Sequence, residues 1–205
     1  MIARLSPGNR LVVATHNKGK IAEFRDLLAP LGIDLVSSGE LGVPEPEETG
    51  DSFAANARLK AEATALAVSL PALADDSGIE IEALGGAPGI YSARWAGESR
   101  DFSAAMARVE KELRDKGALA TSPRANFTSM LCLATPEGEA EFYEGKVFGH
   151  LRFPPSGTKG FGYDPIFVPD GHDITFGEME PAEKHRISHR AVAFEAFAKA
   201  RLPRI

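Results

Sequence analysis

The stretch that decides the fold is residues 11–28, "LVVATHNKGKIAEFRDLL". Its first part, residues 11–14, is an apolar run typical of a short buried strand. Its second part has apolar residues at the spacing of an amphipathic helix: Ile21, Phe24, Leu27, Leu28 and Leu31. A strand that runs through a tight turn into a helix favours an α/β fold. It also places two lysines, Lys18 and Lys20, in the turn.

The bulk composition suits one soluble domain. A chain of 205 residues that is 43% hydrophobic can bury one ample core, so we expect a single domain over residues 1–205. The net charge of −6 argues against general binding to nucleic acid, which needs a basic surface. Cys132 is the only cysteine, so no internal disulfide can form. No apolar run approaches the roughly 18 residues of a membrane span, so we expect a cytoplasmic protein that makes no contact with the membrane.

The remaining pattern alternates helices and strands. Helices are predicted over residues 52–69, capped by Thr49 or Asp51, over residues 101–116, capped by Asp101, and over residues 189–201. Strands are predicted at residues 79–82, after a turn at Asp76-Ser77-Gly78, and at 166–168, and residues 124–151 read as an antiparallel meander of two or three strands with a turn at 136–138.

Two charged clusters could act on the same kind of ligand. The turn at residues 15–20 can hold an anion, although it is no P-loop, because Ile21 follows Lys20; a polar connector is the alternative. Asp75 and Asp76 follow an apolar run, and adjacent carboxylates repel, so they need a cation unless they only form a β-turn. Oxygen ligands without a Cys or His cluster favour Mg²⁺. Lysines for phosphate and carboxylates for Mg²⁺ together predict a nucleoside triphosphate or another polyphosphate.

Two later segments could contact the rest of such a ligand. "KGFGYDP", residues 159–165, sets two aromatic residues between glycines, which suits a flat group. "EKHRISHR", residues 183–190, offers several hydrogen-bond donors beside a helix start. A glycine turn with core aromatic residues and a solvated basic helix end are the alternative interpretations.

Together these segments resemble one known family. "THNKGK", "EETG", "ADDSGIEIEALGGAPGIYSARWAG", "GFGYDPIFVP" and "ISHR" occur in the order and spacing of the inosine triphosphate pyrophosphatase family, also called Ham1-like or non-canonical purine NTP pyrophosphatases. The resemblance extends from Leu11 to Phe197. It implies an enzyme that uses Mg²⁺ to cleave ITP, dITP and XTP between the α and β phosphates. The products would be a monophosphate and pyrophosphate, so deaminated purines would leave the nucleotide pool.

The resemblance also implies roles for individual residues. Glu47 and Asp76 match the magnesium ligands, with Glu48 as an alternative to Glu47, and Asp76 also matches the proton acceptor; Asp75 is a candidate second ligand. The residues that match the triphosphate-binding turn are Thr15, His16, Asn17, Lys18, Gly19 and Lys20, and Ser77 matches a further substrate contact. Those that match the segment packing on the base are Phe161, Gly162, Tyr163 and Asp164. Those that match the groups reading the edge of the base are Lys184, His189 and Arg190.

The fold implied by the resemblance is a single α/β domain with a long mixed β-sheet flanked by helices. The sheet would span two lobes with the substrate cleft between them, and the protein would be a homodimer. Two other functions are also compatible with the sequence. A Maf-type nucleotide pyrophosphatase would act on other bases, although it gives no reason for "GFGYDP" and "SHR". A non-catalytic sensor would bind ITP with Mg²⁺ and release no pyrophosphate.

Overall fold

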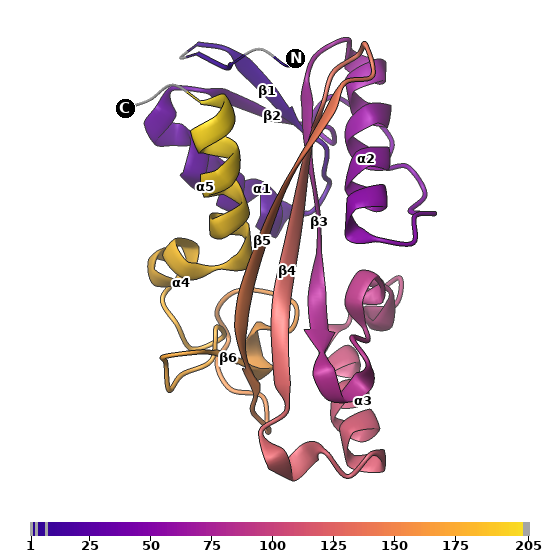
Figure 1. Ribbon diagram of the computed structural model, residues 1–205, viewed down its shortest axis with the longest axis vertical. Coiled ribbons are helices and arrows are strands. Elements are labelled where there is room, and N and C mark those ends of the chain that lie inside the picture. Colours follow the sequence, from indigo (N-terminus) through magenta and orange to yellow (C-terminus); the bar gives the residue numbers. More distant parts are fainter. Residues whose placement is uncertain (1, 3, 7, 203–205) are drawn as a thin grey trace. The chain divides into compact units, whose positions relative to one another are not determined.

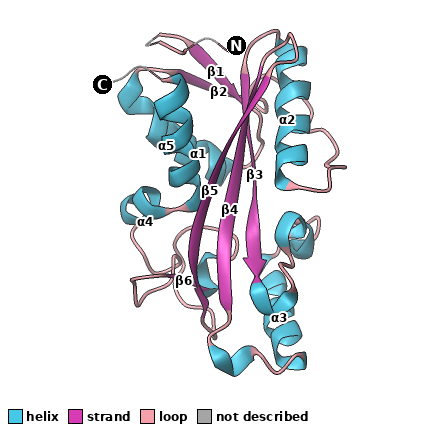
Figure 2. Ribbon diagram, in the orientation of Figure 1, coloured by secondary structure: helices cyan, strands magenta, loops and turns pink. Residues whose placement is uncertain are grey.

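A computed structural model describes residues 2, 4–6 and 8–202 of the chain. Its strands form one six-stranded sheet in the order β2-β1-β3-β4-β5-β6, with helices beside it (Figures 1 and 2). The strands are β1 Arg10–Val13, β2 Asp34–Ser37, β3 Ala72–Ile81, β4 Arg124–Ala134, β5 Ala140–Leu151 and β6 Phe167–Pro169. The α-helices are α1 Lys18–Leu28, α2 Phe53–Val68, α3 Phe102–Asp115, α4 Pro181–Ile187 and α5 His189–Arg201. The predicted α/β class is therefore confirmed.

The sheet is mixed, as predicted. Strand β1 pairs in parallel with both β2 and β3, whereas β5 pairs antiparallel with β6. The chain passes from β1 through α1 to β2, and then through α2 back across β1 to β3. Because such crossovers are right-handed, two crossovers in opposite directions place their helices on opposite faces of the sheet.

The chain divides into two compact units. Unit 1 comprises Met1–Asp76, Ser129–Gly145 and Arg190–Ile205, and unit 2 comprises Ser77–Thr128 and Lys146–His189. Strands β3, β4 and β5 each contribute residues to both units. The boundary in β3 falls between Asp76 and Ser77, which adjoin in the sequence.

Unit 1 buries both faces of its part of the sheet. On one face, α1 and α5 pack large apolar side chains such as Phe24 and Phe197 against Leu73. On the other face, α2 packs small ones, Ala57 and Ala61, against alanines and the buried Cys132. Small residues let a helix approach the strands closely, which explains the alanine-rich sequence of α2. Both faces are covered, as a mostly parallel region requires.

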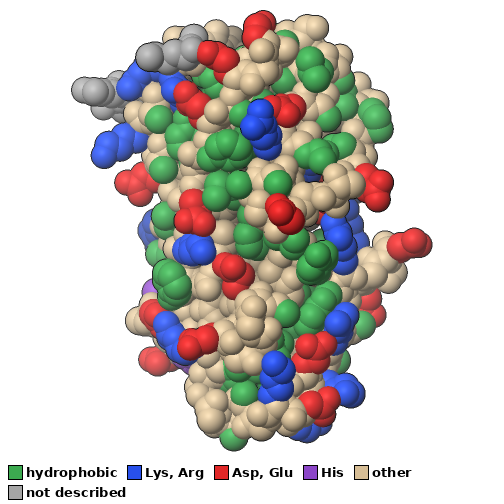
Figure 3. Space-filling model, turned by 45° about the vertical axis from the view of Figure 1, so that its right-hand side comes forward, with side chains coloured by type: hydrophobic (Ala, Val, Ile, Leu, Met, Phe, Trp, Pro, Cys, Tyr) green, Lys and Arg blue, Asp and Glu red, His purple; other side chains and the backbone are tan. Residues whose placement is uncertain are grey.

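Unit 2 has its own core, which α3 covers with one face. Met106, Val109 and Leu113 of α3 are buried, and the aromatic rings of Phe127 and Phe167 pack edge to face at 4.8 Å. The opposite face of α3 carries ion pairs at a spacing of four residues, such as Arg108 with Glu112. Basic and acidic side chains are interspersed on the face of the molecule that Figure 3 shows.

Several predicted elements are confirmed with small changes at their ends. Asp101 caps α3, and α5 spans the predicted residues. Lys18 and Lys20, predicted in a turn, form the first turn of α1, which begins at Lys18. The cap of α2 is Ser52, whose hydroxyl accepts from the Ala55 N–H, so the prediction of Thr49 or Asp51 was wrong. Residues 124–151 form two strands, joined through the predicted turn.

One local prediction was wrong, and one helix was missed. The predicted turn at Asp76-Ser77-Gly78 lies inside the ten-residue strand β3. At its glycine, an added Cβ would lie 2.3 Å from the carbonyl oxygen of Gly89, so only glycine fits there. The helix α4 was not predicted, because its seven-residue length leaves little periodic signal.

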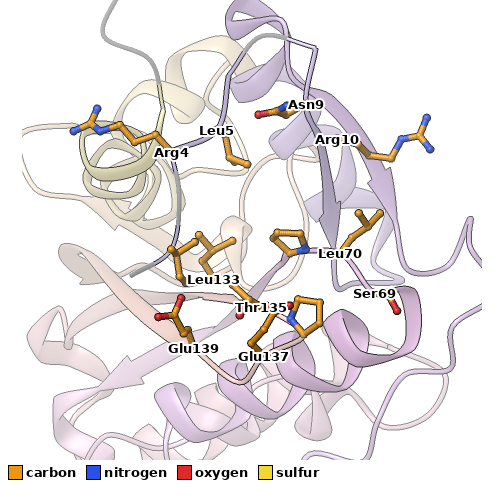
Figure 4. A pocket seen from close by; sticks show the side chains of 13 residues that line it. Arg4, Leu5, Asn9, Arg10, Ser69, Leu70, Leu133, Thr135, Glu137 and Glu139 are labelled. Atoms are coloured by element: carbon orange, nitrogen blue, oxygen red, sulfur yellow. The ribbon is translucent and has the colours of Figure 1, made fainter.

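Unit 1 also contains a hollow of about 540 Å³ at the end of the sheet where β4 turns into β5 (Figure 4). Leu70 and Leu133 line it, while the guanidinium groups of Arg4 and Arg10 point away from it. Thr135 also lines the hollow; its side chain is buried, and its hydroxyl has no hydrogen-bond partner among the described residues. Across the described ranges, no helix has the length and apolar character to span a bilayer.

Candidate functional site

Asp75 lies in β3 at the centre of a buried ionic network in unit 1. Its carboxylate accepts from the Ser129 hydroxyl at 2.7 Å and from Arg190 Nε and Nη2 at 3.1 and 2.8 Å. Lys20 Nζ lies 2.9 Å from the same carboxylate, and Glu23 of α1 also pairs with Arg190. Burial opposes the ionised form, but the charges of Arg190 and Lys20 hold the pKa of Asp75 well below its usual value.

This network changes the expected roles of two residues. Asp75 is already neutralised by two cations, so it is a poor candidate for a second metal ligand. Arg190, expected to read the edge of a base, is 1% exposed and forms ion pairs with Asp75 and Glu23. Burial alone would lower its pKa, but the two carboxylates raise it, so the guanidinium stays charged. The arrangement therefore assigns Arg190 to the support of β3 and α1.

The first turn of α1 is organised by Asn17. Its side-chain oxygen accepts from the backbone N–H groups of Gly19 and Lys20, at 2.9 and 3.3 Å, and the Thr15 hydroxyl accepts from the Asn17 N–H at 3.1 Å. Two of the N–H groups expected to face an anion are thus bound within the turn. The helix start still carries its positive dipole end and the exposed Lys18.

His16 and Lys20 use their side chains within unit 1. The His16 ring hydrogen-bonds the Val43 carbonyl through Nε2 at 2.8 Å, and Lys20 donates to the Asp75 backbone carbonyl at 3.0 Å. Burial is the largest influence on Lys20 and lowers the pKa of its ammonium, although Asp75 opposes this. These contacts leave the backbone of His16, rather than its ring, as the part that can contact a ligand.

Asp76, the next residue of β3, belongs to a second buried group. Its Oδ1 lies 2.6 Å from Lys60 Nζ, and the same ammonium donates to Glu48 Oε1 at 2.8 Å. Lys60 comes from α2 and is 4% exposed, whereas Glu48 comes from the loop before that helix. Burial is the largest influence on Asp76 and raises the pKa of its carboxyl, while Lys60 opposes this.

The Asp76 group has room for one more positive charge. Asp76 Oδ2 is buried and has no hydrogen-bond partner among the described residues. Asp76 also shares the single ammonium of Lys60 with the Glu48 carboxylate. An unsatisfied buried carboxylate oxygen suits a hard cation. Glu48 takes part in this group, whereas Glu47 is exposed, so the geometry favours the predicted alternative, Glu48.

No larger metal-binding cluster is present in the described part of the chain. None of its His, Cys, Asp and Glu residues come together in groups of three or more that could hold a metal ion. Mg²⁺ fits a smaller donor set, because it usually binds proteins through one or two carboxylates and completes its coordination with substrate phosphates and water. Asp76 and Glu48 are such a set.

Unit 2 holds a compact group around Asp164. Its Oδ2 accepts from the Phe161 backbone N–H at 2.7 Å and from Lys184 Nζ at 2.5 Å. The Lys184 ammonium also lies 4.8 Å from the centre of the Phe161 ring. An added Cβ at Gly160 would lie 2.1 Å from Asp164 Oδ2, which explains the glycine there. The structure thus joins three predicted residues, and Asp164 uses its carboxylate to hold the other two.

Two other residues expected near the base have different surroundings. Tyr163 is 2% exposed and its hydroxyl donates to the Ser92 carbonyl at 2.8 Å, so its ring belongs to the core. Burial raises the pKa of that hydroxyl. His189 is also buried, and its ring stacks on that of Phe127 with 4.9 Å between the ring centres. Ser77 is half-buried in β3. Of the two aromatic residues in "GFGYDP", only Phe161 is placed to stack on a ligand.

Sequence reasoning missed the lysine that joins the two carboxylates. The sequence predicts the helix that carries Lys60 but gives that lysine no role, whereas Asn56, Lys60 and Thr64 form a buried stripe on α2. Their spacing of four residues is the signal that could have revealed the stripe. Glu23 and Ser129 were also missed, because their partners lie far away in the sequence.

Comparisons with known proteins agree on one family. The chain matches the Ham1 family over residues 11–200. It is similar to the dITP/XTP pyrophosphatase of Rhodopseudomonas palustris, with 58% identity over 198 residues, covering 93% of this chain and 94% of the relative. The dITP/XTP pyrophosphatase of Rhodospirillum centenum is 57% identical over 187 residues, which cover 91% of this chain and 92% of the relative.

Two solved structures have the same fold. A HAM1 protein from Coxiella burnetii aligns with a TM-score of 0.86 and 36% identity, covering 94% of this chain and 98% of its own. The Staphylococcus aureus Ham1 protein aligns with a TM-score of 0.80 and 36% identity, covering 94% of this chain and 99% of its own.

Proposed function

The chain belongs to the Ham1 family, and we propose that it hydrolyses non-canonical purine nucleoside triphosphates, as the names of its dITP/XTP pyrophosphatase relatives indicate. The substrates would be ITP, dITP and XTP, and the products the nucleoside monophosphate and pyrophosphate. The enzyme would thereby remove deaminated purines from the nucleotide pool. The observation that carries this proposal beyond the relatives' names is the buried oxygen of Asp76, beside Glu48 and Lys60, which has no hydrogen-bond partner among the residues that the structure describes.

Asp76 is the residue we assign to proton transfer. Its carboxyl has a raised pKa, which brings it nearer the range in which a carboxylate acts as a general base. In the proposed reaction a water oxygen bonds to the α-phosphorus, Asp76 takes the proton of that water, and the bond to the leaving pyrophosphate breaks. Mg²⁺, held by Asp76 and Glu48, would supply positive charge to the triphosphate oxygens.

Cations at two places in unit 1 would act on the phosphates. Lys18 is exposed at the positive end of the α1 dipole, and the backbone of residues 15–17 adjoins it. Lys20 is held by Asp75 and keeps positive charge beside Asp76. Such fixed positive charge favours the extra negative charge that develops on a departing pyrophosphate.

The Asp164 group of unit 2 is the proposed basis for choosing the purine. The Lys184 ammonium can only donate hydrogen bonds, so it matches the carbonyl at the six position of hypoxanthine and xanthine. The amino group of adenine at that position has no acceptor to offer, and a site built around one hydrogen bond rejects such a partner strongly. Phe161 would pack on the ring of the base, because Asp164 fixes its backbone beside Lys184.

One assay tests the function. The protein is incubated with Mg²⁺ and ITP, dITP, XTP, GTP, ATP or TTP, and the products are identified. We expect inosine and xanthosine monophosphates together with pyrophosphate, and little product from ATP or TTP. Binding of ITP without any product would support the non-catalytic sensor, and preference for other bases would support a Maf-type enzyme.

The proposal includes a cytoplasmic homodimer. The cytoplasmic location rests on Cys132, the only cysteine of the sequence, which cannot form an internal disulfide and so suits a reducing compartment. The homodimer rests on the resemblance to the family. Analytical ultracentrifugation of the purified chain decides between monomer and dimer.

A further inference from the structure

Two side chains on one face of α2 hold the loop that carries Glu48. Lys60 donates to Glu48 Oε1, and Asn56, four residues earlier on the helix, accepts from the Gly50 backbone N–H at 2.8 Å through Oδ1. Glu48 and Gly50 are two residues apart. We call residues 45–51 the acidic loop, so this loop is attached to α2 at two points one helical turn apart.

The contact between Asn56 and the acidic loop is close and buried. Asn56 is 0% exposed. An added Cβ at Gly50 would lie 2.6 Å from Asn56 Oδ1 and 2.7 Å from the Cβ of Ala55, so the loop backbone lies directly on the helix. Any side chain at Gly50 would push the loop away from α2.

The buried amide of Asn56 makes the fold less stable than an apolar residue of similar size would. Its Nδ2 is buried and has no hydrogen-bond partner among the described residues. A buried donor without a partner carries a desolvation penalty, and a leucine of similar size would avoid it. An amide at this place is therefore better explained by the loop contact than by core packing.

We propose that Asn56 is a positioning residue for Glu48. Resting on the proposed function, the inference is that Asn56 Oδ1 fixes the acidic loop so that the Glu48 carboxylate stays beside Lys60 and Asp76. Asn56 touches neither substrate nor metal in this role. Without the contact at Gly50, the loop loses one of its two attachments to the buried stripe of α2, and Glu48 spends less time beside Asp76.

Loss of the Asn56 contact should lower the affinity for Mg²⁺ rather than the turnover rate. Loss of a residue that orients a metal ligand typically lowers metal affinity by roughly 10- to 100-fold. We therefore expect Asn56→Leu to raise the Mg²⁺ concentration for half-maximal ITP hydrolysis by about tenfold. Turnover at saturating Mg²⁺ should change little, because Asp76 and Lys60 keep their own contact.

Two comparison variants separate positioning from general damage. Asn56→Asp keeps an acceptor for the Gly50 N–H, so it should retain the loop contact. Thr64→Val changes another buried polar residue of the same stripe, two turns further along α2. This variant controls for loss of stability, because any effect of packing in α2 should appear in it as well.

The decisive readout needs neither metal nor substrate. Hydrogen–deuterium exchange of a peptide spanning residues 45–51 reports directly on the Gly50 N–H. Exchange should be faster in Asn56→Leu and close to wild type in Asn56→Asp and Thr64→Val. Should Asn56→Leu fail to fold, Asn56→Ser, whose side chain is too short to reach the loop, replaces it with the same expectation.

The outcomes distinguish this inference from the proposed function. Unchanged exchange in the acidic loop, or a Mg²⁺ dependence equal to that of wild type in Asn56→Leu, would overturn the positioning role. Equal shifts in Asn56→Leu and Thr64→Val would overturn it too. If the wild-type protein releases no pyrophosphate from ITP, the proposed function fails by itself, and the exchange measurement still decides whether Asn56 anchors the loop.

Discussion

The ammonium of Lys60 lies 2.6 Å from Oδ1 of Asp76, and less than a tenth of either side chain is exposed. Glu48 shares that ammonium, and the second oxygen of Asp76 has no hydrogen-bond partner in the described part of the chain. A buried carboxylate is tolerated when its charge is balanced. Lys60 therefore balances part of the negative charge of Asp76, and the second carboxylate oxygen can bind a cation or accept a proton.

Replacing Asp76 by asparagine should nearly abolish turnover. The amide cannot accept a proton and is a weaker ligand for Mg²⁺, so we expect kcat for ITP to fall by roughly 10²- to 10⁴-fold. The thermal midpoint of unfolding should be measured in parallel to show that the variant is folded. Near-normal turnover in a folded Asp76→Asn variant would refute the assigned role.

Replacing Lys60 by methionine should change both stability and the pH profile. Removing one partner from a buried ion pair typically costs about 3–5 kcal/mol, which a urea titration can measure. The Lys60 charge lowers the pKa of Asp76, so its loss should raise that pKa. The acidic limb of kcat/KM against pH should then move to higher pH.

The matched control is Arg58→Met on the same helix. Arg58 is exposed and pairs with Glu62 at 2.7 Å, so its loss should change the free energy of unfolding little and leave the pH profile in place. An unmoved acidic limb in Lys60→Met would show that Lys60 does not influence the catalytic base.

Replacing Lys184 by methionine should weaken the choice of purine. The apolar chain of methionine keeps the packing near Phe161 but removes the donor, and a hydrogen bond to a charged group is worth about 1.5–3 kcal/mol. We expect kcat/KM for ITP to fall by roughly 10- to 100-fold and that for ATP to change little. A parallel loss for both nucleotides would contradict the assignment of Lys184 to the six position.

Glu178 should make unit 2 sensitive to acid. The Thr175 backbone N–H, the Ser156 hydroxyl and Arg152 lower the pKa of Glu178 to about 2, against an ordinary value of 4.5. A carboxyl with a lower pKa in the folded state stabilises the fold above the unfolded pKa, and this stabilisation is lost as the pH falls from about 5 towards 2. In urea titrations, the stability difference between wild type and Glu178→Gln should shrink over that range. A constant difference would count against this ionic contribution.

Replacing Thr135 by valine should raise the free energy of unfolding, whereas most substitutions of buried residues lower it. The Thr135 hydroxyl lies in the hollow of unit 1 and has no hydrogen-bond partner within the described ranges, so Thr135→Val removes an unsatisfied group and keeps the shape. We expect the free energy of unfolding to rise by about 1 kcal/mol with no change in ITP hydrolysis. A decrease in stability would mean that the hydroxyl binds a water molecule or another ligand in the hollow.

The parts of the fold that local sequence patterns govern were predictable. Strand β1, helix α1 and the cap at Asp101 follow from periodicity and from side chains within a few residues. The continuity of β3 was not predictable, because Asp76-Ser77-Gly78 is typical of a turn. In the structure, partners distant in sequence hold it straight, such as Arg190, which lies 115 residues after Asp75.

The candidate site was predictable in outline and not in detail. The resemblance pointed to Asp76 and Lys184, but the sequence could not separate Glu47 from Glu48, because adjacent residues of a loop have no periodicity. Nor could it show that Lys60 faces inward, since a lysine in a helix usually faces solvent. These features depend on how α2 packs against β3, which only the tertiary structure specifies.

The proposed reaction is tested most directly by hydrolysing ITP with Mg²⁺ in water enriched in ¹⁸O and locating the label by mass spectrometry. Attack of water on the α-phosphorus predicts one ¹⁸O atom in inosine monophosphate and none in the pyrophosphate released during a single turnover. Label in the pyrophosphate, or release of labelled orthophosphate, would contradict the account.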